Sequence, residues 1–158
     1  MRARFAPLLL AFAACAKAPD TSAGTSEGGD VVAITALRDS IQAAETGGRP
    51  DGMFAAFAED VVVMAPGMPA LEGKTAATEA MRGMFQAMTL SVQYASAEMV
   101  VMGDWAFDRG NYTGTMTPKA GGPATTDRGK YLWVLHRQAD GTWKYHRVIW
   151  NADAAAAN

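Results

Sequence analysis

The chain has 158 residues, 19% of them charged and 49% hydrophobic, and a formal net charge of −2. This length fits one domain with an appendage and is long enough to bury a core. Nucleic-acid binding depends on a basic surface that neutralises phosphates, so the acidic balance and the lack of a basic stripe exclude a nucleic-acid-binding protein.

The first segment, residues 1–15, is predicted to be an export signal. Two arginines precede an apolar run over residues 5–14, which is too short to span a bilayer but suits the core of a signal peptide. Cys15, the only cysteine, follows small residues as in a lipobox, where the lipidated cysteine becomes the mature N-terminus. The predicted location is therefore the bacterial envelope, as a membrane-anchored lipoprotein. Cleavage after Ala16, which would give a soluble periplasmic protein, is the alternative.

Residues 16–29 are predicted to form a flexible tether. They are rich in Ser, Thr, Gly and Pro and lack apolar periodicity, so they cannot bury enough surface to offset the entropy of ordering. Such a spacer would let a folded domain over residues 30–152 stand clear of the membrane. The acyl chains on the cysteine would then make the membrane contact. Residues 153–158 are expected to fray.

Three helices are predicted in the first half of the domain. Asp30 is a candidate N-cap for the first helix, whose apolar residues repeat at helical spacing until a pair of glycines. Pro50 begins a short second helix, and the third extends over residues 75–88. The short β-rich run 61–64 lies between the last two helices.

Four long strands are predicted in the second half. They are expected over residues 90–101, 105–117, 125–138 and 142–151. Gly-Asp and Asp-Gly turns and a loop rich in Gly and Pro separate them, which indicates consecutive hairpins and an antiparallel meander. The fold class is therefore α+β: a curved, cone-shaped antiparallel sheet of four long strands and one short strand, packed under three N-terminal helices. The opening between helices and sheet is the expected ligand pocket.

Seven short motifs keep a fixed order along this domain. They occupy residues 60–67, 69–74, 102–106, 109–112, 128–132, 140–144 and 149–151. Together they resemble the SnoaL-like, nuclear-transport-factor-2-like superfamily, and within it the branch catalogued as domain of unknown function 4440. The resemblance implies a cone with a deep pocket, often dimeric through the outer sheet face. Relatives include ketosteroid isomerases, polyketide cyclases, epoxide hydrolases and non-catalytic binding domains, so the resemblance does not decide the activity.

One position departs from this resemblance. Related sequences often carry an aspartate directly before the Ile-Trp-Asn ending, where this chain has Val148. If that aspartate lines the pocket of relatives, this chain lacks one candidate general base. The departure favours binding over catalysis.

Strand alternation predicts which side chains line the pocket. Tyr131 and Trp133 share the bulkier, uncharged face of the third long strand and are expected to point inward. On the last strand His146 and Trp150 are expected to point inward, together with the residue between them. Tyr112 of the second long strand completes the predicted pocket.

Two side chains are candidate general bases. His146 can exchange a proton near neutral pH, or instead order the sheet through a hydrogen bond to a tyrosine. Asp108 shares a face with Tyr112 and could abstract a proton beside a carbonyl, with Tyr112 or Tyr131 stabilising the enolate; the alternative is an exposed strand residue. His136 and His146 lie on different strands, so no zinc site is expected. No phosphate or dinucleotide motif predicts a cofactor.

Three functions stay open on this evidence. The leading hypothesis is an envelope-tethered domain that binds a small, largely apolar molecule and forms a homodimer. The second is an enzyme of isomerase or cyclase type that uses a pocket His or Asp as base. The third is a structural dimerisation domain, whose cone would be filled by its own side chains.

Overall fold

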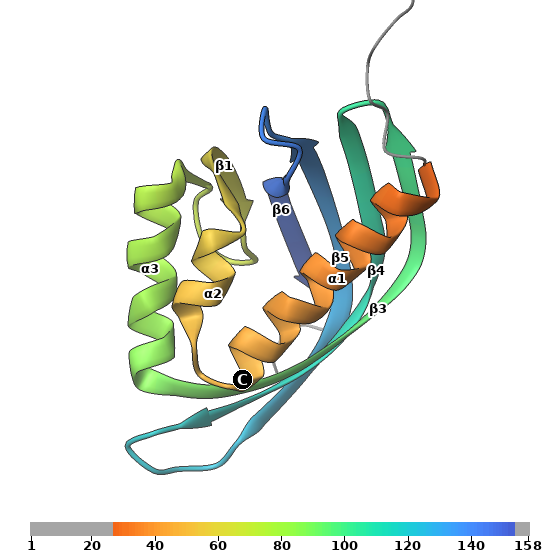
Figure 1. Cartoon of the computed structure of the whole chain (residues 1–158). Helices are drawn as coiled ribbons and strands as arrows, with labels where there is room; N and C mark the ends of the chain where they lie inside the picture. Colours follow the sequence, from red (N-terminus) through yellow and green to blue (C-terminus); the bar gives the residue numbers. More distant parts are fainter. Residues whose placement is uncertain (1–26, 154–158) are drawn as a thin grey trace, which may run out of the picture.

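Helices lie against one face of a strongly curved sheet (Figure 1). A computed structural model describes residues 27–153 of the chain. The elements in chain order are α1 (Glu27–Thr46), α2 (Pro50–Ala55), β1 (Phe57–Met64), β2 (Leu71–Glu72), α3 (Lys74–Ala87), β3 (Met88–Met102), β4 (Trp105–Pro118), β5 (Thr125–Arg137) and β6 (Trp143–Ala152). The predicted helices and long strands are confirmed, and the predicted short strand is the second half of β1.

The strands of the described residues form one open six-stranded sheet in the order β2-β1-β6-β5-β4-β3. Strands β3 to β6 make the predicted antiparallel meander. Strand β1 joins the other side of β6 in parallel, so the sheet is mixed rather than purely antiparallel. The two-residue strand β2 pairs with β1 and was not predicted. The α+β class and the curved cone are confirmed.

The N-terminal end of α1 differs from the prediction. The helix begins at Glu27 and so includes the last residues of the predicted tether. The prediction that Asp30 caps the helix is wrong: Asp30 lies inside the helix and is 3% exposed. Its carboxylate accepts hydrogen bonds of 2.6 and 2.7 Å from Arg137 and one of 3.2 Å from the indole N–H of Trp143. These partners lie more than 100 residues away, so local sequence could not reveal them.

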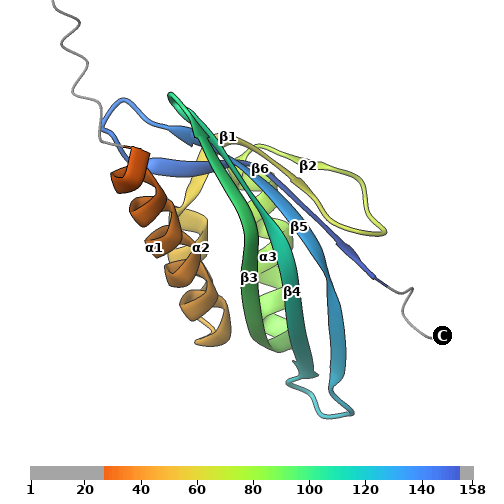
Figure 2. The ribbon, with the colours of Figure 1, turned by 90° about the vertical axis from the view of Figure 1, so that its right-hand side faces the viewer.

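Two glycines allow the long strands to bend beneath the helices (Figure 2). An added Cβ at Gly110 would overlap the carbonyl oxygen of Ala95, and one at Gly129 would overlap that of Asn151. Side chains are excluded at both positions because neighbouring backbone approaches so closely. A register shift in β3 opposite Gly110, between Ser96 and Glu98, adds a β-bulge at the same level.

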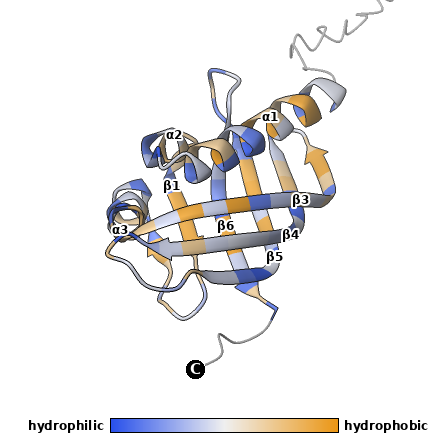
Figure 3. Ribbon diagram, turned by 90° about the horizontal axis from the view of Figure 1, so that it is seen from below, coloured by the Kyte–Doolittle hydropathy of each residue, from blue (hydrophilic) through white to orange (hydrophobic). Residues whose placement is uncertain are grey.

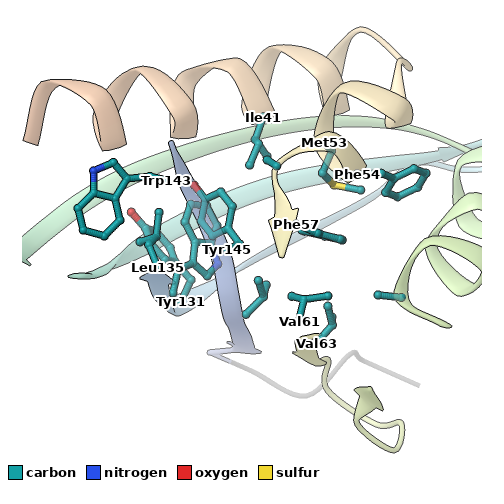
Figure 4. Close-up of a cluster of buried hydrophobic side chains, with 14 of the residues drawn as sticks. Ile41, Met53, Phe54, Phe57, Val61, Val63, Tyr131, Leu135, Trp143 and Tyr145 are labelled. Atoms are coloured by element: carbon teal, nitrogen blue, oxygen red, sulfur yellow. The ribbon is translucent and has the colours of Figure 1, made fainter. Parts of the chain in front are cut away.

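The core lies between the helices and the concave sheet face. Figure 4 shows Ile41 of α1 and Met53 of α2 pointing toward the strands that carry Tyr131 and Tyr145. Seen from below, the strands interleave hydrophobic and hydrophilic residues (Figure 3), which is the pattern expected when one sheet face is buried. This alternation places a row of aromatic side chains from β5 and β6 under the helices.

The predicted export signal, the lipidation site Cys15 and most of the tether lie outside the described residues. The frayed tail also lies outside them, apart from Asp153. Within residues 27–153, no helix combines the length and the apolar character needed to cross a membrane.

Candidate functional site

A cavity of about 160 Å³ opens between the helices and the concave face of the sheet. Its apolar lining includes Ile41, Met53, Phe57, Met81, Met84 and Leu90. A dry apolar cavity of roughly 150 Å³ holds a benzene-sized molecule, so the enclosed part of this cavity matches about one ring. The helices and the long strands all contribute lining residues, as the predicted cone requires.

The four aromatic residues predicted to surround the pocket lie along the cavity. They are Tyr112, Tyr131, Trp133 and Trp150. Val148, which stands where relatives often carry an aspartate, lines the cavity too. Their position is therefore established, whereas their contact with a ligand stays a prediction.

The predicted inward orientation of His146 is wrong. Leu135 of β5 pairs with Tyr145 of β6, and the adjacent Val134 pairs with Arg147, so His146 is an extra residue without a partner on β5. A β-bulge of this kind shifts the two-residue alternation by one position. Tyr145, which simple alternation would place on the face opposite His146, is consequently buried and lines the cavity, while His146 turns away from it.

On the outer side of the sheet, His146 is held by neighbouring polar and aromatic groups. Its Nε2 lies 3.0 Å from a carboxylate oxygen of Asp60. Its ring also packs edge-to-face on Trp105, which stacks in turn on His136 with ring centroids 4.2 Å apart. These contacts agree with the alternative in which His146 orders the sheet, although its hydrogen-bond partner is an aspartate and not a tyrosine.

Asp108 faces inward, so the exposed-strand alternative is wrong, but it is not among the cavity-lining residues. Its carboxylate accepts hydrogen bonds from Arg38 at 3.2 Å, Ser96 at 2.5 Å and the Tyr131 hydroxyl at 3.3 Å. With 0% exposure it is part of a buried ion pair. The structure does not bring Asp108 and His146 together at one point, so it gives no support to either as a base acting in the cavity.

A carboxyl group that the sequence analysis missed does line the cavity. Glu45, near the end of α1, is only 7% exposed. The hydroxyl of Tyr94 on β3 donates a hydrogen bond to its carboxylate at 2.9 Å. Burial raises the pKa of Glu45 to about 7, because an apolar environment disfavours the charged form and the hydrogen bond from Tyr94 offsets only part of that effect.

Two further tyrosines of the cavity wall have hydroxyl groups with raised pKa values. Burial raises the pKa of Tyr131 to about 12 and that of Tyr145 well above its ordinary value. The Tyr145 hydroxyl is fully buried and has no hydrogen-bond partner among the described residues. Unpaired buried hydroxyls are rare in folded proteins, and this one belongs to a residue that lines the cavity.

Asp127, also missed, is a second acidic group on the cavity wall. Its carboxylate accepts a 2.7 Å hydrogen bond from the Tyr112 hydroxyl. No lysine, arginine or histidine of the described chain lines the cavity. The ionisable groups of the described lining are therefore acidic and phenolic, with no cationic side chain.

One sequence signal could have revealed Glu45. It follows Ile41 by four positions and therefore lies on the apolar face of the predicted helix, where a charge is unexpected. Tyr145 could not have been found in this way, since its orientation depends on the bulge. Among residues 27–153, no group of three or more His, Cys, Asp or Glu side chains is arranged to hold a metal ion.

Comparison with solved structures supports the cone fold. A ketosteroid isomerase-like protein from Erwinia carotovora atroseptica is 28% identical, with 80% of this chain and 98% of that chain covered and a TM-score of 0.73. A proposed scytalone dehydratase from Novosphingobium aromaticivorans is 20% identical over 79% of this chain and 85% of that one, with a TM-score of 0.71. A nuclear transport factor 2-like protein from Salmonella enterica is 15% identical, with 78% of this chain and 91% of that chain covered and a TM-score of 0.69.

No protein of curated function matches the chain significantly. The narrower assignment to the domain of unknown function 4440 branch stays a prediction. The model of the SnoaL-like domain family matches residues 37–146, which is more than half of the sequence. The chain therefore belongs to the SnoaL-like domain family.

Proposed function

We propose that this protein binds a small, largely apolar molecule in the cone cavity. The observation that carries the proposal is an open cavity with apolar walls and a few polar groups at defined points, which is typical of small-molecule sites. A purely structural domain would have an interior filled by its own side chains, and the cavity argues against such a domain.

Filling the cavity tests this proposal. Gly114 lines the cavity, and an added Cβ there would lie 3.9 Å from the nearest atom. Gly114→Leu should therefore occupy ligand space without disturbing the backbone. Thr113→Leu, one residue along on the opposite, exposed face of β4, is the matched control.

The probes are neutral one-ring compounds: benzyl alcohol, acetophenone and indole, titrated by isothermal calorimetry. We expect at least one to bind the wild type and the Thr113→Leu variant, and Gly114→Leu to weaken that binding by about tenfold or more. If none of the three binds, or if both variants bind equally well, the proposal fails.

A second candidate function, proton-transfer catalysis, is favoured by the pKa of Glu45. A general base is most effective when its pKa lies near the working pH, and Glu45 lies in the cavity with a pKa of about 7. Its carboxylate would take a proton from a carbon beside a carbonyl. The C–H electron pair would form a C=C bond while the carbonyl oxygen became an enolate oxygen. Returning that proton to another carbon completes an isomerisation.

This second candidate agrees with the similarity to a ketosteroid isomerase-like protein. It is tested with 3-cyclohexenone, a one-ring ketone whose conversion to the conjugated 2-cyclohexenone is followed by ultraviolet absorbance. Catalysis by Glu45 predicts acceleration that Glu45→Gln reduces by about 100-fold or more. Acceleration that survives this substitution, or none at all, would leave binding as the function.

We also propose that the protein is tethered to the bacterial envelope through a lipidated Cys15. The support is the sequence order of charged start, apolar run, cysteine and spacer. Mass spectrometry of the mature N-terminal peptide tests it. A diacylglyceryl group on Cys15 is expected, whereas a peptide that begins unmodified at Lys17 would show ordinary cleavage.

Homodimer formation through the outer sheet face is proposed on the basis of its exposed apolar side chains. Trp105, Leu132 and Ile149 project from β4, β5 and β6 on the side away from the helices. Leu132→Asp should shift a dimer to monomer in light scattering. A wild type that is monomeric at micromolar concentration would contradict this proposal.

A further inference from the structure

We propose that the cavity selects ligands that carry a protonated amine, and that the Glu45 carboxylate pairs with the ammonium group. The inference rests on the proposed ligand-binding function and names the class of ligand. It is derived from the distribution of charge on the cavity wall, the hydrogen-bonding capacity of the buried Glu45 carboxylate, and the aromatic rings beside it.

The charge on the wall opposes anions and favours cations. Glu45 and Asp127 are its ionisable acids, and no basic side chain of the described residues lines it. Arg38 does not line the cavity and donates to Asp108 at 3.2 Å. An acidic ligand would therefore meet carboxylates without a cationic partner. An ammonium group would meet the opposite charge in a poorly hydrated site, where such attraction is strong.

Glu45 has hydrogen-bonding capacity left for a ligand. A carboxylate offers about four acceptor positions, and Tyr94 donates to one of its oxygens. Burying such a group is unfavourable unless it is paired, and 93% of Glu45 is removed from solvent because it is only 7% exposed. A cation bound next to it would offset that penalty.

Tyr145 adds a second buried polar group near Glu45. Its hydroxyl is fully buried without a partner among residues 27–153, and it lies within electrostatic range of Glu45. An ammonium group has three N–H donors. One of them can be directed to the Glu45 carboxylate.

Aromatic rings next to these groups favour the same class of ligand. Trp133 is surrounded by Tyr94, Tyr131 and Tyr145, with ring centroids 4.7, 4.1 and 5.2 Å away. All four residues line the cavity. Ring faces attract cations, most strongly where water is excluded, and the rings also match the apolar part of an aromatic or aliphatic amine.

The experiment compares three probes that share one ring and differ in charge: benzylamine, benzyl alcohol and benzoate. Dissociation constants are measured by calorimetry at about pH 8, where Glu45 is ionised. Each probe is titrated into the wild type, into Glu45→Gln and into Asp39→Asn. Asp39 is an exposed acid on the same helix, so its substitution controls for the loss of one negative charge.

We expect benzylamine to bind the wild type and Asp39→Asn about tenfold or more tightly than benzyl alcohol, and benzoate to bind most weakly. In Glu45→Gln the preference for benzylamine over benzyl alcohol should disappear. If benzyl alcohol binds and benzylamine is not preferred, or if the preference survives in Glu45→Gln, the amine inference is wrong and the binding function stands. If no probe binds, both fail.

Discussion

The hydroxyl of Tyr94 donates a 2.9 Å hydrogen bond to the carboxylate of Glu45 and so joins β3 to the last turns of α1 across 49 residues of sequence. The contact holds the carboxyl group of Glu45 at the cavity wall, where burial raises its pKa to about 7. The pair thus connects the packing of α1 on β3 with the position of an ionisable group in the cavity wall. Both proposed uses of the cavity, pairing with a cation and transferring a proton, depend on Glu45 remaining there.

Glu45 should make the stability of the protein fall as pH rises. Its folded pKa of about 7 lies above the unfolded value of 4.5, so the folded state holds the proton more tightly. Its stabilising contribution is therefore complete below about pH 4.5 and is lost as the pH rises through about 7. The loss is roughly 3 kcal/mol for a shift of this size. Urea denaturation from about pH 5 to 8 should show this decline in the wild type and not in Glu45→Gln.

The informative quantity is the difference in unfolding free energy between the wild type and Glu45→Gln. Between about pH 5 and pH 8 the unfolding free energy of the wild type should fall progressively relative to that of Glu45→Gln. A difference that is constant over this range would show that the carboxyl is not buried in the folded state.

The ion pair between Asp30 and Arg137 should contribute strongly to stability. Arg137 binds both carboxylate oxygens of Asp30 and lies 4.4 Å above the ring of Trp143, which fixes the start of α1 to β5 and β6. Asp30→Ala leaves a largely buried arginine without this partner, so a loss of about 3 kcal/mol is expected in thermal or urea denaturation. Asp104→Ala removes an exposed carboxylate that also contacts Arg137, and it should lower stability by less than about 1 kcal/mol. Equal losses for both variants would contradict this account.

The overall fold could be predicted from sequence because its determinants are local. The spacing of Ile34 and Ile41 marks the buried face of α1, and Pro50 marks the start of α2. Turns at Gly103 and Gly141, both with positive φ, separate the strands of two hairpins. Each of these signals acts over a few residues and needs no knowledge of the rest of the chain.

The site was predicted only in part, because its remaining determinants are not local. The bulge at His146 exchanges the faces of Tyr145 and His146, and the pairing of β5 with β6 creates it. The orientation of Asp108 stayed open on sequence alone, because its partner Arg38 lies 70 positions earlier and ties it to α1 instead of the cavity. The alternation of strand residues therefore predicts on which face of the sheet a side chain lies, whereas the pairing of distant segments decides which side chains it contacts there.

The glycines at the strand bends should tolerate no side chain. An added Cβ at Gly110 would overlap backbone of β3, whereas at Gly114, four residues along the same face, it would make ordinary contacts. We expect Gly110→Ala to lower the unfolding free energy by about 3 kcal/mol or more, or to prevent folding. Gly114→Ala should leave stability unchanged or raise it by up to about 1 kcal/mol. Similar stabilities for the two variants, measured by denaturant titration, would show that the strands are not bent as described.

Asp108 should act on stability and not on ligand binding. Asp108→Ala removes the buried partner of the largely buried Arg38 and leaves it only the exposed carboxylate of Asp39 at 3.5 Å, with an expected loss of about 3 kcal/mol. Adding Arg38→Met should recover part of this loss, since the double variant no longer buries a charge that has lost its buried partner. Benzyl alcohol affinity should stay within about threefold of the wild type in any of these variants that folds, because neither residue lines the cavity. Additive losses would mean that the two residues do not interact.

Methionine methyl resonances offer the most direct test of ligand binding in the cone. Met53, Met81, Met84 and Met116 line the cavity, whereas Met68 and Met102 are exposed elsewhere and serve as internal references. In a titration of protein labelled with ¹³C in its methionine methyl groups, benzyl alcohol should shift the cavity methyl signals in a saturable manner and leave the reference signals in place. If the cavity signals do not move, or if the shifts are confined to Met68 and Met102, the cavity is not the binding site.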